Sequence, residues 1–199
     1  MARNQRDSIE LFHDYGLHIP TRTIYVGSEN SADSGIDGGE SGVDHMLSAR
    51  LIKNLHALET INSEPITIIL NNVGGDEYHC IAIYDAIRAA KSHVTIKVMG
   101  SAMSCGSIIL QAADRRVMSP NSVQMIHYGT WGVNDHAKTA QAVSKEGERI
   151  DAWMEQLYLN RIQEKLPNFK LKKLQDLLMI DTYLTAQQCV DLGLADEIE

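Results

Sequence analysis

The residue with the clearest chemical potential is Ser104, which stands among small residues. It lies in the segment 100–107, where a strand is expected to end and a helix to begin. A serine at such a junction is accessible to a carbonyl group and lies beside the free amides of the helix N-terminus. The alternative is that the small residues only let the helix pack tightly. The serine therefore needs partners before it can be regarded as a nucleophile.

His127 and Asp181 are candidate partners for this serine. A hydroxyl is a weak nucleophile unless an imidazole accepts its proton, and the imidazole works best when a carboxylate fixes its tautomer. His127 ends the apolar run 123–126, where a buried strand emerges towards a glycine-containing loop. Asp181 competes with three other carboxylates near the C-terminus, namely Asp176, Asp191 and Asp196. Taken singly, each of these residues could equally have only a structural role.

A glycine turn could supply the remaining component of such a site. Gly74 and Gly75 follow the apolar run 66–70, and their amides are not covered by a Cβ atom. Exposed amides can stabilise the oxyanion of a tetrahedral intermediate. We expect the amides of Gly75 and Cys105 to form this pair, the alternative being an ordinary tight turn.

The elements that would position these residues alternate between strand and helix, which predicts an α/β fold. Strands are expected at 23–26, 66–70, 94–98, 116–118 and 123–126, and helices at 43–58, 78–90 and 108–113. The longest helical stretch, 137–165, carries an apolar stripe and ends before Pro167. We expect it to project from the body and to pack against another copy of the chain. A short helix, an element at 181–184 and a helix capped by Thr185 follow.

Composition narrows the classes of function. The chain has 18 basic and 26 acidic residues and a net charge of −8, and the dispersed basic residues argue against nucleic acid binding. No apolar run approaches the roughly 18 residues of a membrane-spanning helix, and the polar N-terminus lacks the apolar core of a signal peptide. The three cysteines lack metal-type spacing. We therefore expect a cytoplasmic protein with no membrane segment, metal or cofactor.

The length favours one domain over the whole chain, 1–199. Within it we expect an N-terminal arm at 1–22 and a flexible loop of glycine, serine and acidic residues at 27–42. The long helical region covers about 133–168, and 169–199 would complete the site.

Taken together and in this order, the motifs resemble the proteolytic subunit of the Clp protease, including its viral and prophage relatives. The match spans about 23–199, and its most telling parts are 74–75, 102–106, 120–127 and 181–186. The resemblance implies a spiral of ββα units of the ClpP/crotonase type, in which the long helix is a projecting handle.

The resemblance also assigns roles. The family's nucleophile falls on Ser104, its base on His127, its third member on Asp181 and its oxyanion amides on Gly75 and Cys105. It implies a serine-type endopeptidase without a cofactor, acting on peptides or unfolded proteins. Family members form homo-oligomers of seven-membered rings, stacked into a tetradecamer, often with an unfolding ATPase as partner.

Two departures from the family pattern are visible. The usual Ser-Pro-Gly-Gly of the oxyanion turn is Asn-Val-Gly-Gly at 72–75, and the usual proline after the histidine is absent from 128–132. The backbone donors survive both changes. The insertion at 27–42 and the lack of a clear family-type N-terminal loop leave dependence on an ATPase open.

Two alternative functions compete with the peptidase. A crotonase-like acyl-CoA enzyme would share the fold and use glycine-turn amides to bind a thioester enolate. That alternative leaves Ser104 and His127 without a role. An inactive ring or scaffold subunit would keep the assembly but not the chemistry.

Overall fold

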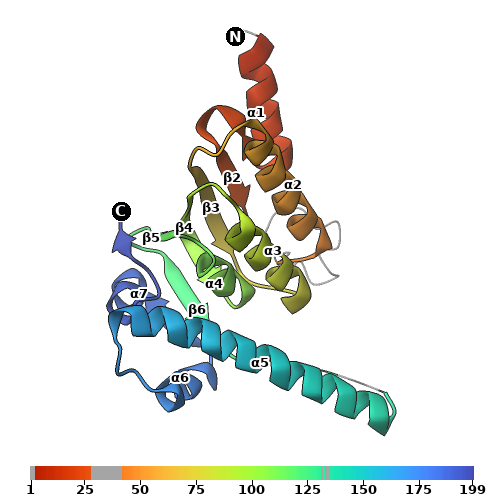
Figure 1. The fold of residues 1–199 in the computed structure, drawn as a ribbon, viewed down its shortest axis with the longest axis vertical. Coiled ribbons are helices and arrows are strands. Elements are labelled where there is room, and N and C mark those ends of the chain that lie inside the picture. The colour runs from red at the N-terminus through yellow and green to blue at the C-terminus, as the bar shows by residue number, and fades with distance from the viewer. Residues whose placement is uncertain (1–2, 28–41, 131, 133–134) are drawn as a thin grey trace.

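A mostly parallel sheet forms the centre of the chain (Figure 1). The computed structural model describes residues 3–27, 42–130, 132 and 135–199. Within these residues the sheet has eight strands in the order β1-β2-β3-β4-β5-β8, with β6 attached to β4 and β7 attached to β6. The strands are β1 (Leu17–His18), β2 (Thr23–Val26), β3 (Ile66–Asn72), β4 (Val94–Met103), β5 (Arg115–Met118), β6 (Val123–Ile126), β7 (Thr182–Thr185) and β8 (Glu197–Ile198).

The helices cover the sheet and extend beyond it. They are α1 (Arg3–Tyr15), a 3-10 turn (Ile19–Thr21), α2 (His45–Ile61), α3 (Glu77–Ala89), α4 (Cys105–Leu110), α5 (Ala137–Lys165), α6 (Leu171–Leu178) and α7 (Ala186–Leu192). Figure 1 shows α2, α3 and α4 beside one another over the sheet, and these helices contact each other in that order. Asp44 caps α2 by accepting from the Leu47 amide at 2.8 Å, and Asp76 caps α3 in the same way.

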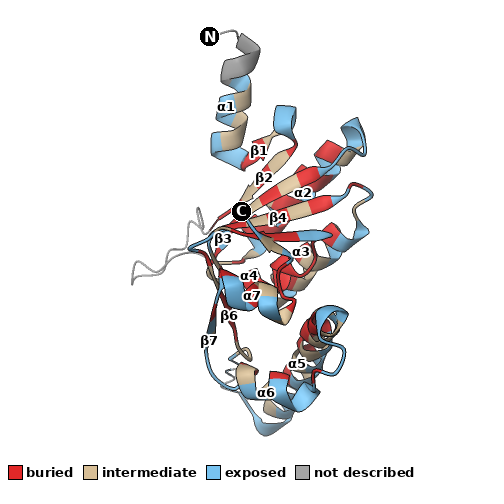
Figure 2. Ribbon diagram, turned by 90° about the vertical axis from the view of Figure 1, so that its left-hand side faces the viewer, coloured by how far each residue is buried: buried red, intermediate tan, exposed pale blue. Residues whose placement is uncertain are grey.

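The core lies between the central strands and these helices. Ile66, Ile68 and Leu70 alternate along β3 and are fully buried, as expected for β-branched and aliphatic residues in a strand covered by helices. Figure 2 shows the buried residues concentrated along the central strands and on the helix faces that cover them. This packing fixes the strand ends, which carry the candidate functional residues.

Strand β4 joins the two parts of the sheet. Its first half pairs in parallel with β5, and its second half pairs in parallel with β6, where Met103 lies opposite Met125. Strand β7 then pairs antiparallel with β6, with Thr182 opposite Ile126. The ends of β4 and β6 and the start of β7 therefore meet at one place.

Helix α5 is anchored at only one end. Its buried residues begin at Gly147 and continue to Ile162, whereas the preceding turns are mostly exposed. Figure 1 shows its N-terminal half projecting from the body. The hydroxyl of the buried Tyr158 forms a hydrogen bond with the Ser107 hydroxyl, which attaches α5 to α4.

Most of the predicted elements are confirmed, and the differences have local causes. Strands β2 and β6 and helix α5 have the predicted bounds. Strand β4 runs beyond the expected 98 because the residues after Gly100, whose φ is 101°, pair with β6, and α4 starts at Cys105 instead of 108. The loop expected at 27–42 falls almost entirely outside the described residues.

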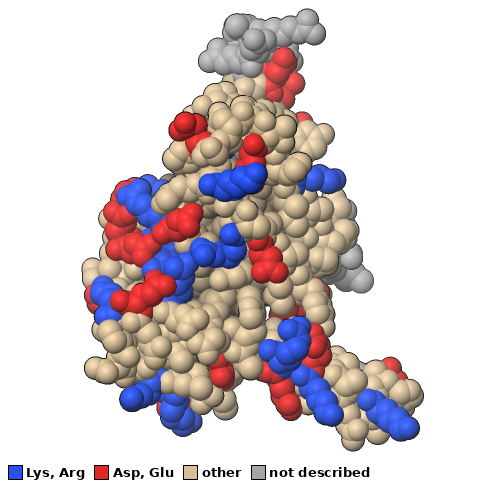
Figure 3. Space-filling view, viewed as in Figure 1, with Lys and Arg blue, Asp and Glu red and all other residues tan. Residues whose placement is uncertain are grey.

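The N-terminal arm expected at 1–22 contains α1 and β1, and β1 is attached to the edge of the sheet through β2. No helix among the described residues is long and apolar enough to cross a membrane. On the face shown in Figure 3, lysine and arginine side chains are interspersed with acidic ones. At the edge of the sheet, Arg115 forms ion pairs with Glu197 and Glu199.

Candidate active site

Ser104 lies at the turn from β4 into α4 and has an unusual backbone conformation. Its φ of 50° and ψ of −122° lie in a region that residues other than glycine rarely adopt. The Ser104 amide donates to the Met125 carbonyl at 2.9 Å, and the Ser104 carbonyl accepts from the Ser107 amide at 2.9 Å. These bonds hold the strained turn between strand and helix. Strain of this kind is maintained where surrounding structure fixes it, and it often marks a functional site.

His127 follows the last residue of β6 and reaches the serine directly. Its Nε2 atom lies 2.9 Å from Ser104 Oγ. The parallel pairing of β4 and β6 places both residues at the same edge of the sheet, although they are 23 positions apart. The sequence prediction that these two residues cooperate therefore has the geometry it requires.

Asp181 precedes β7 and contacts the other side of the imidazole. The Oδ1 atom of Asp181 lies 2.9 Å from His127 Nδ1. The antiparallel pairing of β6 and β7 brings the two residues together across 54 positions. The His127 side chain is 23% exposed and that of Asp181 is 57% exposed.

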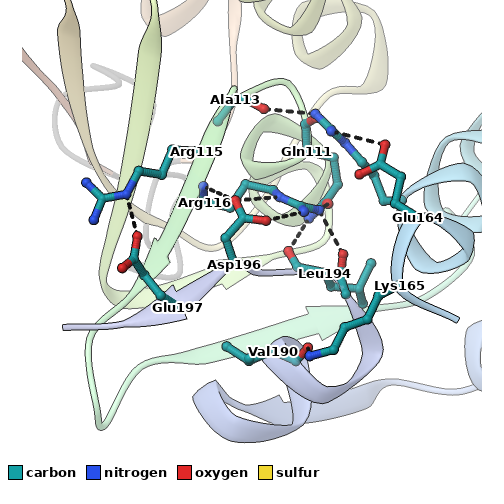
Figure 4. A network of polar contacts seen from close by, with 12 residues as sticks. Gln111, Ala113, Arg115, Arg116, Glu164, Lys165, Val190, Leu194, Asp196 and Glu197 are labelled. Carbon is teal, nitrogen blue, oxygen red and sulfur yellow. Dashed lines mark hydrogen bonds and ion pairs between the residues drawn. The ribbon is translucent and has the colours of Figure 1, made fainter.

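The three competing carboxylates have other partners. Asp176 pairs with Lys172 at 2.8 Å, and Asp191 accepts from Gln187 at 2.9 Å. Asp196 binds the buried Arg116 on β5 (Figure 4). Among the four aspartates, Asp181 is therefore the one placed against the imidazole.

The glycine turn lies beside the serine, where side chains would not fit. Gly74 and Gly75 have φ values of 107° and 147°. A Cβ atom on Gly74 would lie 2.6 Å from Ser104 Cβ and 3.1 Å from its Oγ, and one on Gly75 would lie 2.4 Å from the Val43 backbone. Glycine is therefore required at both positions by conformation and by close approach.

A thiol links the two residues whose amides were expected to act together. Cys105 is the first residue of α4, so its amide has no acceptor within the helix. Its Sγ donates to the Gly75 carbonyl at 3.1 Å, and the Cys80 thiol donates to the Cys105 carbonyl at 3.4 Å. Burial raises the pKa of Cys80, so its thiol stays protonated and continues to donate.

A narrow recess opens next to the serine and the imidazole. Its walls come from α3, α4 and α5 and are mainly apolar, with two carboxylates; they include Glu77, Ile81, Ser104, Cys105, Ile108, His127, Gly129, Ile150, Asp151, Trp153 and Met154. Burial raises the pKa of Asp151, and the nearby Glu155 and Glu77 raise it further. The accessible volume of the recess is about 20 Å³, which is the space of about one water molecule.

Sequence reasoning missed a set of polar contacts behind the imidazole. The Tyr128 hydroxyl donates to Glu155, which also accepts from Gln175 at 3.1 Å. Tyr128 stood out in the sequence only as a departure from the family pattern. Glu155 is 27 positions further along the chain, and no motif or spacing connects the two residues.

Comparison with known proteins identifies one family of relatives. The family model described as Clp protease matches residues 36–199. The chain is 30% identical over 187 residues to the ATP-dependent Clp protease proteolytic subunit of Deinococcus radiodurans, covering 92% of this chain and 83% of that protein. It is 28% identical over 159 residues to proteolytic subunit 2 of Pseudomonas aeruginosa, covering 79% and 77%.

A solved structure is similar over almost the full length. A ClpP1 mutant from Listeria monocytogenes superposes with a TM-score of 0.73 at 26% identity, covering 91% of this chain and 92% of that one. The expected spiral of strands and helices with a handle is thereby confirmed. The family match spans most of the chain, and the chain belongs to the Clp protease family.

Proposed function

We propose that this Clp-type peptidase is a serine endopeptidase that hydrolyses peptide bonds through an acyl-enzyme on Ser104. The observation that carries the proposal is the continuous line of contacts from Ser104 Oγ through His127 to Asp181, with 2.9 Å at each step. Hydroxyl, imidazole and carboxylate in this order are the arrangement that activates a serine.

Each residue has a defined task in the proposed reaction. His127 Nε2 accepts the hydroxyl proton while Ser104 Oγ bonds to the carbonyl carbon of the substrate. Asp181, at Nδ1, holds the tautomer and stabilises the imidazolium. His127 then protonates the leaving amine as the C–N bond breaks. In the second half, water gives a proton to His127 and attacks the ester carbon, and Ser104 recovers its proton as the acid leaves.

The amides of Gly75 and Cys105 would stabilise the negative charge that develops on the carbonyl oxygen. A Cβ atom at position 74 would clash with Ser104, so the glycine leaves its backbone uncovered on the side that faces the nucleophile. The Cys105 thiol donates a hydrogen bond to the Gly75 carbonyl at 3.1 Å, which holds the segments that carry the two amides together. Loss of one such donor typically lowers the rate about a hundredfold to a thousandfold.

The alternatives explain less of the site. Binding a thioester enolate would use the glycine amides but would give no task to the Ser104–His127–Asp181 contacts. A scaffold without activity would not need a strained serine turn aligned with an imidazole. The peptidase uses all of these features.

We propose further that the enzyme works in the cytoplasm on peptides or unfolded proteins, as a homo-oligomer of seven-membered rings stacked into a tetradecamer. The projecting half of α5 offers a surface for another copy, and the apolar side chains of Met179, Ile180 and Tyr183 beside Asp181 are 70%, 70% and 59% exposed. The relatives are named as ATP-dependent subunits, which supports an unfolding ATPase as a partner.

A serine-directed fluorophosphonate tests the chemistry. We expect stoichiometric labelling at Ser104, located by mass spectrometry of the peptides, and hydrolysis of a short fluorogenic peptide. The Ser104→Ala variant should lose both, with hydrolysis lower by about 10⁴-fold or more. Undiminished hydrolysis in this variant would end the proposal.

The same samples separate the alternatives. Rings seen by native mass spectrometry, without labelling or turnover, would support the scaffold. Tight binding of coenzyme A without labelling would support the acyl-CoA enzyme.

A further inference from the structure

Three polar side chains from three separate elements converge directly behind His127. Tyr128 is the next residue after the imidazole, and its hydroxyl donates to Glu155 Oε1. The side-chain amide of Gln175 donates to the same oxygen at 3.1 Å. Glu155 lies on α5 and Gln175 lies on α6, so one carboxylate connects both helices to the end of β6.

The backbone around this carboxylate is tied to the end of α6. The Tyr128 amide donates to the Leu178 carbonyl at 2.9 Å. On the other side of the site, the Thr182 hydroxyl donates to the Leu177 carbonyl at 2.6 Å. Tyr128 and Thr182 are the direct neighbours of His127 and Asp181 in the sequence. The end of α6 therefore sets the separation of the two segments that carry the imidazole and the carboxylate.

Asp181 needs support from other segments because few side chains pack around it and the residues that precede it. Its side chain is 57% exposed, and the preceding Met179 and Ile180 are each 70% exposed. Within a single copy of the chain, packing does not fix the position of this segment from the solvent side. Its place must come from the α6 end and from β7, and the α6 end is held to α5 by the contact of Gln175 with Glu155.

We propose that Glu155 is a positioning residue, which holds the His127–Asp181 pair in line with Ser104 through its hydrogen bonds to Tyr128 and Gln175. The inference rests on the proposed peptidase function. The hydrogen bonds of Glu155 go to Tyr128 and Gln175 and not to the reacting groups themselves. It acts on the relative placement of two chain segments, and a displacement of about 1 Å in such a site can lower the rate about a hundredfold.

The protonation state of the Tyr128 hydroxyl supports the positioning role of Glu155. Burial raises the pKa of its hydroxyl, and the hydrogen bond to Glu155 raises it further. The hydroxyl therefore stays protonated and donates throughout the range in which the enzyme would work. The Tyr128 ring is partly buried against the core, so the side chain has a fixed direction.

Substitutions at Glu155 separate positioning from a general contribution to stability. Glu155→Ala should lower kcat for a short peptide about tenfold to a hundredfold and slow fluorophosphonate labelling of Ser104 in parallel, with little change in KM. Glu155→Gln should recover most of the loss because its amide oxygen can accept both hydrogen bonds. Tyr128→Phe, which removes one donor, should fall between them.

The same helix offers a matched control. Glu146 also accepts from a tyrosine, Tyr78, at 3.2 Å, and it pairs with Arg149 at 2.7 Å. Neither Tyr78 nor Arg149 adjoins Ser104, His127 or Asp181 in the sequence, so Glu146→Ala should leave kcat and labelling unchanged. Thermal unfolding and native mass would establish that every variant compared is folded and assembled like the parent.

The outcomes distinguish the two proposals. A parent enzyme that neither labels nor hydrolyses would overturn the peptidase and this inference with it. An active parent with an equally active Glu155→Ala variant would overturn the inference alone. A folded Glu155→Gln variant that is as impaired as Glu155→Ala would also overturn the inference. The loss of the carboxylate charge, and not the loss of the positioning hydrogen bonds, would then explain the lower activity.

Discussion

Two aspartates near the C-terminus bind basic residues at the sheet, and they are built in opposite ways. Asp181 makes a single contact with His127, and its side chain is 57% exposed. Asp196 accepts three hydrogen bonds from Arg116, at 2.5, 2.6 and 3.2 Å, from the guanidinium and the backbone amide. The Arg116 side chain is only 4% exposed.

The other hydrogen bonds of Arg116 add to the difference between the two aspartates. Its remaining guanidinium nitrogen donates to Gln111 at 3.0 Å and to the Gly193 carbonyl at 2.8 Å, and Gln111 in turn donates to Leu194 (Figure 4). A buried charge with four side-chain hydrogen bonds favours one arrangement of the chain. The exposed pair leaves the imidazole free to exchange a proton. The contact of Asp196 with Arg116 therefore stabilises the C-terminal strand, whereas the contact of Asp181 with His127 serves the proposed chemistry.

The largest expected effect separates the two aspartates by activity. Asp181→Asn should lower kcat by about 10⁴-fold, because the imidazole loses the carboxylate that fixes its tautomer. Asp196→Asn should keep activity near that of the parent, because it lies away from the reacting groups. Steady-state hydrolysis of one fluorogenic peptide measures both. Equal losses in the two folded variants would contradict the assignment of Asp181.

The next effect separates Asp196 from Asp181 by their contributions to the free energy of unfolding. Asp196→Ala should lower the free energy of unfolding by about 3 kcal/mol or more, because it leaves the charge of Arg116 buried without its partner. Asp181→Ala should change it by no more than about 0.5 kcal/mol, because its side chain is exposed. Denaturant titrations provide the values. A larger loss for Asp181→Ala would show that this contact, too, stabilises the fold.

A smaller effect concerns pH. Burial alone would raise the pKa of Asp196, but the hydrogen bonds and charge of Arg116 outweigh it and hold this pKa below its ordinary value. Asp196 therefore contributes stability above about pH 4, the usual range of an aspartate, and this contribution is lost as the pH falls through the lowered pKa. Unfolding followed from pH 6 to pH 2 should show the loss, and Asp196→Asn should flatten it. An unchanged profile in the variant would contradict the role of this group.

The smallest effect is expected at the exposed rim of the same edge. Arg115 pairs with Glu197 and Glu199, and these side chains are all 40% or more exposed. Arg115→Gln should cost at most about 1 kcal/mol of stability, and the cost should shrink in 1 M salt. A loss as large as that of Asp196→Ala would mean that the rim, and not the buried network, holds β8.

The fold and part of the site could be predicted because their signals are local. Apolar runs predicted β2 and β6, and an apolar stripe ending before Pro167 predicted α5. Ser104 among small residues, His127 at a strand end and the Gly74–Gly75 turn were identifiable from their neighbours. The start of α4 was predicted three residues late because its first turn is made of the same small residues as the preceding bend.

The sequence by itself determined the strands, the helices and the residue types available for acyl transfer, because these depend on neighbours a few positions away. Only the tertiary structure decided which aspartate reaches the imidazole and that Glu155 lies behind it. Both decisions depend on how β6 pairs with β7 and how α5 packs, which joins residues 54 and 27 positions apart. Contacts over such separations arise from packing of the whole chain. Local surroundings do not tell the four aspartates apart, and before the structure only the family resemblance pointed to Asp181.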